Sequence, residues 1–254
     1  MLLNNWLILD LYSKSFLIVL LCGFLIGIAK TGISGAGLAV VPLMAYVFGG
    51  KPSTGLLLPL LIMADIFAVY YYNRHAQWSY ILKLLPWAFA GILVATFTGK
   101  YISDKLFSHI ISYLVIIGVV LMIWQELKGK NISVPDYAWF AALMGLAGGF
   151  STMIGNAAGP IMALYLLAMH LPKNVFIGTG AWFFLIVNLS KVPLHIFIWK
   201  TINLETFTFD LLILPAILIG VFVGIKIVKL IPEKLFKAII LATTLITALL
   251  IFKP

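Results

Sequence analysis

Ionisable side chains are rare inside the apolar stretches of this sequence, so the few that occur there are the first candidates for chemistry. Lys30 ends the first apolar stretch, and Asp65 lies in the middle of the third. The eighth stretch holds Asn188, Lys191 and His195, whose i, i+3, i+7 spacing places them on one face of a helix. A charged group in such a position is costly and is a functional candidate by default. We therefore predict an anion site that includes Lys30, Asn188 and Lys191. Asp65 and His195 are the candidates for proton coupling.

Each of these residues also has a purely structural interpretation. Lys30 and Lys191 can extend their long side chains to a membrane interface. Asp65 can simply pair with a lysine, and His195, close to Pro193, can be a hydrogen-bonded residue at a helix end. The surroundings of each side chain decide between the two interpretations.

Two glycine-rich runs interrupt apolar sequence, at residues 31–37 (TGISGAG) and 154–160 (IGNAAGP). Both are typical of turns. A helix that begins at such a turn points unpaired N–H groups and the positive end of its dipole at whatever lies in front of it. Serine and asparagine are good N-cap residues, glycine lets backbone approach a ligand, and Pro160 suits a first helical turn. The residues that we expect to contact an anion at these turns are Ser34, Gly35, Gly37, Asn156 and Gly159.

Glycine can also serve only to bring helices close together, as small residues do in membranes. We prefer this interpretation for Gly23, Gly27, Gly145 and Gly149, which lie within apolar stretches and outside the two runs.

The elements that position these residues are predicted to be membrane-spanning helices. Of the 254 residues, 63% are hydrophobic and 10% are charged, far from the composition of a soluble domain. The long apolar runs lack the alternation of a barrel strand. Residues 16–48 as one helix would be roughly 50 Å long, against a hydrocarbon core of about 30 Å. The helix must therefore break near the first glycine run.

The chain carries an internal duplication. Gly23, Gly27 and Gly37 match glycines that lie 122 residues later, and residues 100–107 (KYISDKLF) match residues 229–236 (KLIPEKLF) at an offset of 129. We predict one transmembrane domain over residues 1–254, with repeats at 16–125 and 137–252 and a linker at 126–136. Each half then holds a broken or re-entrant glycine-rich helix pair and three spanning helices. The distribution of lysine and arginine favours inverted over parallel repeats.

Several motifs together resemble the TauE/SafE sulfite exporter family, also called the toluene sulfonate uptake permease family. They are residues 23–27 (GFLIG), 32–37 (GISGAG) and 41–43 (VPL) in the first half, and 145–150 (GLAGGF), 155–160 (GNAAGP), 177–180 (IGTG) and 191–193 (KVP) in the second. The resemblance spans nearly the whole chain. It implies a secondary carrier in the plasma (inner) membrane for sulfite, thiosulfate or an organosulfonate such as sulfoacetate, with proton coupling as an option. Where the family has a run of glycines, this chain has Ser34, Ala36, Asn156 and Ala157, which leaves the substrate open.

The leading hypothesis is thus a transporter of a small anion and not an enzyme, with membrane lipids as surroundings and a homo-oligomer as an option. The alternatives are an intramembrane serine protease, because Gly-Ile-Ser-Gly at 32–35 matches a short protease pattern, and an anion channel. The net charge of +9 comes mostly from single lysines at the ends of apolar runs, so it indicates topology and headgroup contact and not nucleic acid. We expect no cofactor. The scattered histidines predict no metal site.

Overall fold

The computed structural model describes residues 14–31, 36–103 and 138–232, together with the single positions 106, 113, 120, 235 and 238. Within these ranges the chain is helical and contains no strand. The helices are α1 (Lys14–Thr31), α2 (Ala36–Phe48), α3 (Gly50–Tyr72), α4 (Trp78–Gly99), α6 (Ala138–Gly155), α7 (Gly159–Ala168), α8 (Lys173–Pro193) and α9 (Leu204–Leu230). A short 3₁₀ turn (Asn73–His75) follows α3, and a π turn (Leu194–Ile198) continues α8. The predicted all-α class is confirmed.

Five of the described helical segments are long and apolar enough to cross a membrane. They are Gly50–His75, Trp78–Gly99, Ala138–Gly155, Lys173–Ile198 and Leu204–Leu230. Many large apolar side chains on α4 and α9 are exposed, among them Leu82, Phe97, Leu212 and Phe222. Exposure of such a surface to water would be unfavourable, whereas contact with the hydrocarbon chains of lipid is not. The chain is therefore an integral, multi-pass membrane protein.

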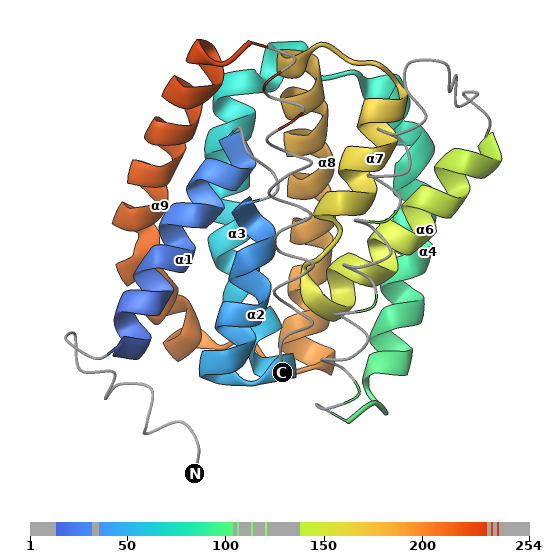
Figure 1. Ribbon diagram of the computed structural model, residues 1–254. Coiled ribbons are helices and arrows are strands. Elements are labelled where there is room, and N and C mark those ends of the chain that lie inside the picture. The colour runs from blue at the N-terminus through green and yellow to red at the C-terminus, as the bar shows by residue number, and fades with distance from the viewer. Residues whose placement is uncertain are drawn as a thin grey trace.

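The described helices alternate in direction within residues 14–103 and again within residues 138–232. In the view of Figure 1, α1, α3, α7 and α9 run upward, and α2, α4, α6 and α8 run downward. The closest neighbours come from different halves of the sequence, because α1 packs along α9, α6 along α4, and α3 along α8. Each of the first two pairs is parallel, and α3 and α8 are antiparallel. Helix α6 carries the glycines that match Gly23 and Gly27 of α1, and it runs in the opposite direction to α1.

Glycines make the two parallel pairs possible. A Cβ on Gly27 would meet the backbone of Ile217 and Val221 in α9, and a Cβ on Gly149 would meet the backbone of Ala88 in α4. A Cβ on Gly23 would meet the side chain of Ile213 in α9, and a Cβ on Gly145 would meet the backbone oxygen of Leu84 in α4. The packing interpretation of these four glycines is confirmed, because any larger residue would push the helices apart.

The second glycine run does break a helix. Helix α6 ends at Gly155 and α7 begins at Gly159, while Ala157 and Ala158 between them are only 1% exposed. The turn therefore lies inside the protein and not at its surface. Its first residue, Asn156, has a φ of 54°, in the left-handed region that asparagine tolerates better than most residues.

The first glycine run lies only partly within the described residues. Helix α1 ends at Thr31 and α2 begins at Ala36, so two helices do replace the single long helix that the apolar pattern would otherwise give. Ser34 and Gly35 lie outside the described residues, as does the whole linker at 126–136. Nearly all of residues 106–124 and 235–252, the C-terminal parts of the two predicted repeats, also lie outside them. The boundaries and orientation of the repeats stay a prediction.

Candidate functional site

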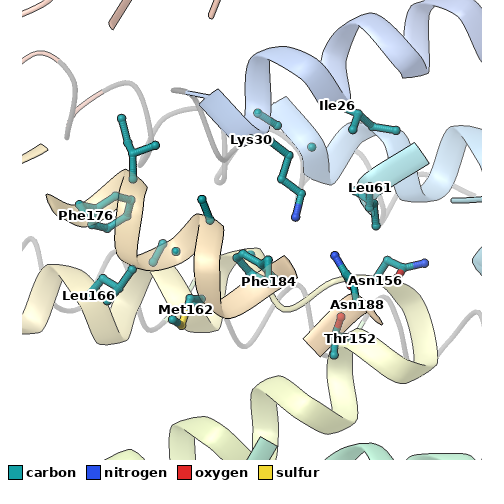
Figure 2. Close-up of a pocket in the computed structure, with 17 residues that line it drawn as sticks. Ile26, Lys30, Leu61, Thr152, Asn156, Met162, Leu166, Phe176, Phe184 and Asn188 are labelled. Atoms are coloured by element: carbon teal, nitrogen blue, oxygen red, sulfur yellow. The ribbon is translucent and has the colours of Figure 1, made fainter. Parts of the chain in front are cut away.

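A cavity of about 90 Å³ lies between the helices of both halves. It is much larger than the roughly 10–15 Å³ that one water molecule needs, so it has room for a small polyatomic solute. Its walls come from α1, α2, α3, α6, α7 and α8. The polar lining residues gather towards one end. Figure 2 shows Lys30, Thr152, Asn156 and Asn188 there, with the apolar Ile26 and Leu61 close by, and Met162, Leu166 and Phe176 towards the other end.

Of the described residues that line this cavity, Lys30 is the charged one. Its Nζ lies 2.8 Å from Oδ1 of Asp65 and 4.1 Å from the centre of the Phe184 ring. The other oxygen of Asp65, Oδ2, accepts a hydrogen bond of 2.7 Å from Asn188 Nδ2. The Asp65 side chain is fully buried and that of Lys30 is 14% exposed. Asp65 is thus paired with a lysine, which agrees with the structural interpretation of this residue. Its partner, Lys30, is the lysine that faces the cavity.

Lys191 lies beside the cavity but does not line it. Its Nζ donates to the backbone oxygen of Thr152 and to Oγ1 of the same residue, both at 3.0 Å, and to Oδ1 of Asn156 at 2.6 Å. The residue is 0% exposed, so it does not extend to an interface. All three acceptors are neutral. A lysine buried among neutral partners inside an apolar helix is expensive, so it is a functional candidate by default.

The N-terminus of α7 faces the same cavity, since Gly159 and Met162 line it. The N-cap residue is Ala158, and no side chain caps the helix. The prediction that Asn156 is a capping residue is therefore wrong, because its side-chain amide forms hydrogen bonds with Lys191 and Thr54 instead. Its Nδ2 donates to the backbone oxygen of Thr54 in α3 at 3.1 Å. The expected proline in the first turn is present.

Matching positions of the two proposed repeats meet at this site. Gly37 and Gly159, at an offset of 122 (159−37), both line the cavity. Asp65 in α3 and Asn188 in α8, which do not match at either repeat offset, form a hydrogen bond between the two halves. The cavity therefore lies where the two halves of the sequence come together.

His195 lies away from the cavity, in the π turn that follows Pro193. Its Nδ1 is 2.8 Å from Oγ1 of Thr201, and its ring packs edge-on against Trp199 at 5.1 Å between centroids. These contacts favour the structural interpretation of His195.

The structure thus brings together most of the predicted residues that it describes. Lys30, Gly37, Asn156, Gly159 and Asn188 line the cavity, Asp65 and Lys191 contact its polar end, and His195 does not reach it. Sequence reasoning missed Thr152 and Phe184. Signals for both were present: Thr152 lies 122 residues after Lys30 (152−30), and Phe184 lies one helical turn before Asn188.

An all-helical, multi-pass bundle with a charged cavity between its halves has the architecture of a membrane transporter. The profile of the TauE/SafE sulfite exporter family matches residues 19–251, nearly the whole chain. The protein therefore belongs to this family of membrane transporters, and the intramembrane protease alternative is not favoured. Comparisons with the curated proteins and with the solved structures give no match.

Proposed function

We propose that this protein is a secondary transporter that carries a small anion across the plasma membrane through the cavity between its halves. One observation carries the proposal. The described side chains at the polar end of the cavity include two lysines, Lys30 and Lys191, and one carboxylic acid, Asp65. With all three groups ionised the site has an excess of positive charge, which an anion in the cavity would neutralise. The uncapped start of α7 would add its N–H groups and helix dipole.

The lining of the cavity favours an amphipathic anion among the sulfur compounds that the family suggests. Sulfite and thiosulfate would fill only the polar end near Lys30 and Asn156. An organosulfonate with an alkyl chain would also place its carbon atoms against Met162, Leu166 and Phe176. Burial of each additional methylene there contributes about 0.8 kcal/mol. We therefore propose an organosulfonate as the substrate.

A thermal-shift series on the purified protein tests this assignment. Sulfite, thiosulfate, methanesulfonate and sulfoacetate are compared with acetate and chloride at equal ionic strength. A ligand at 100 times its Kd stabilises the folded state by about 2.7 kcal/mol, so the substrate is expected to raise the melting temperature by several degrees. The sulfonates should exceed sulfite. Shifts no larger than that of chloride for every sulfur anion would contradict the proposal.

We also propose that the two halves are inverted repeats that exchange conformations during transport. The opposite directions of α1 and α6, and of α3 and α8, support this arrangement. So do the equivalent pairings of α1 with α9 and of α6 with α4. In such carriers the substrate site lies near the midplane while one repeat moves against the other. The position of the cavity at the contact between the halves supports this arrangement.

The Lys30–Asp65 pair suggests how transport could be coupled to protons. An anion that binds Lys30 takes the place of the Asp65 carboxylate, which then lies buried beside a second negative charge. Because that state is unfavourable, Asp65 takes up a proton as the anion binds. One anion and one proton then cross together, and the anion accumulates on the alkaline side of the membrane.

Uptake into proteoliposomes distinguishes this coupling from a channel. Wild-type protein is expected to accumulate labelled sulfoacetate when the lumen is more alkaline than the medium. Asp65→Asn should lose this accumulation and still exchange labelled for unlabelled anion, because the neutral amide cannot carry a proton. Glu205→Gln, which removes an exposed carboxylate at the start of α9, is the matched control and should behave as wild type. Gradient-driven accumulation by Asp65→Asn would exclude Asp65 as the proton carrier.

A further inference from the structure

The ammonium group of Lys191 has no proton left for a ligand in this structure. An ammonium has three N–H donors, and Lys191 donates to three oxygens, two on Thr152 and one on Asn156, at 2.6–3.0 Å. It would have to break one of these bonds to touch an anion. Its shortest bond is the one to Asn156, a residue that does line the cavity.

Asn156 links this lysine to the other half of the protein. Lysine only donates and a backbone carbonyl only accepts, so the amide of Asn156 has one orientation that satisfies both neighbours. Its oxygen accepts from Lys191 in α8, and its nitrogen donates to the backbone oxygen of Thr54 in α3. The same residue has the left-handed backbone, with φ of 54°, that turns the chain from α6 towards α7.

The combination explains why an asparagine stands at this position. Glycine would adopt the left-handed backbone equally well but could not join the two helices. Aspartate would bind the lysine but could not donate to Thr54, and it would cancel the positive charge. Only three residues after Asn156, α7 begins at Gly159. The direction of the first N–H groups of α7 therefore depends on how Asn156 is held.

We propose that Lys191 is a positioning residue that acts through Asn156 and does not itself touch the anion in this state. It holds the α6–α7 turn so that the start of α7 faces the cavity, and it contributes its charge from behind the turn. This inference rests on the proposed function for its effect on binding. The bond between Lys191 and Asn156 and its effect on the turn are independent of that function.

A double-mutant cycle tests the proposal. Sulfoacetate binding is measured by calorimetry for Lys191→Met, Asn156→Gly and the double variant. Each single substitution is expected to weaken binding by roughly tenfold or more, and the double variant should be no weaker than the worse single variant within about twofold. If Lys191 is a direct ligand, Asn156→Gly frees its ammonium. Binding by that variant would then equal or exceed wild type, which overturns the proposal.

Hydrogen exchange without any anion provides the second measurement. The amides of residues 155–161 are expected to exchange faster in both Lys191→Met and Lys191→Gln than in wild type, while those of α4 remain unchanged. Unchanged exchange at 155–161 in a folded variant would overturn the positioning role. A wild-type protein that binds none of the sulfur anions would refute the proposed function, and the exchange experiment would still decide whether Lys191 holds the turn.

Discussion

Replacing Lys30 with methionine is expected to abolish anion binding and to destabilise the protein, and adding Asp65→Asn should restore the stability without restoring the binding. Lys30 is the cation that lines the cavity, and its partner Asp65 is fully buried. Removing one member of a buried ion pair leaves the other charge uncompensated, at a cost of about 3–5 kcal/mol. The double variant removes both charges, and Asn188 can still donate to the new amide.

The two effects are separated by measuring thermal unfolding and sulfoacetate binding on the same four proteins: wild type, each single variant and the double variant. Loss of binding in Lys30→Met alone could reflect poor folding. Loss of binding in a double variant as stable as wild type, together with binding by Asp65→Asn alone, reflects the missing cation. We expect a reduction of at least about a hundredfold, which corresponds to about 2.8 kcal/mol of lost interaction. Tight binding by the double variant would show that the anion site lies elsewhere.

Alanine substitutions at two adjacent glycines of α6 are expected to change stability in opposite directions. A Cβ at Gly149 would collide with the backbone of Ala88 in α4, which cannot move without separating the two helices. Overpacking of this kind costs about 1–3 kcal/mol or more. At Gly148 a Cβ would meet only Ile161, at an ordinary distance of 3.8 Å. There alanine is expected to stabilise the helix, by up to about 1 kcal/mol.

Thermal unfolding of Gly149→Ala and Gly148→Ala checks this prediction, with expression level as a second indicator. The two variants differ by one residue in position and are identical in chemistry, so helix propensity and hydrophobicity cancel in the comparison. Equal melting temperatures would show that α4 and α6 are not in close contact. The same contrast is not available on α1, where both Gly23 and Gly27 face α9.

Much of the fold follows from local patterns of the sequence. The helical membrane class results from apolar runs too long and too continuous for any other element, and the break before α7 results from turn residues inside such a run. The packing role of Gly149 was predictable, because only a small residue permits close helix contact. The prediction that Asn188, Lys191 and His195 share one helix face agrees with their burial, since all three are at most 1% exposed.

The partners of those side chains depended on the tertiary structure. Periodicity places Lys30, Asp65 and Lys191 on helices, but it does not say which helices face each other, and three charges can pair in more than one way. Because α1 and α8 pack against α3, Asp65 forms an ion pair with Lys30. Lys191 lies beside the α6–α7 turn and donates to neutral oxygens there. Asn156 was predicted to cap a helix, yet it bridges α8 and α3 because both helices pass close to the turn.

What the sequence by itself determined is therefore the kind of protein, its interrupted helices and a short set of polar residues within them. These properties depend on the cost of exposing backbone or charge to lipid, which each segment faces on its own. Only the tertiary structure decided that Lys30 faces the cavity while Lys191 lies behind Asn156. That difference arises from contacts between helices whose residues lie 35 to 39 positions apart in the chain, which no local pattern encodes.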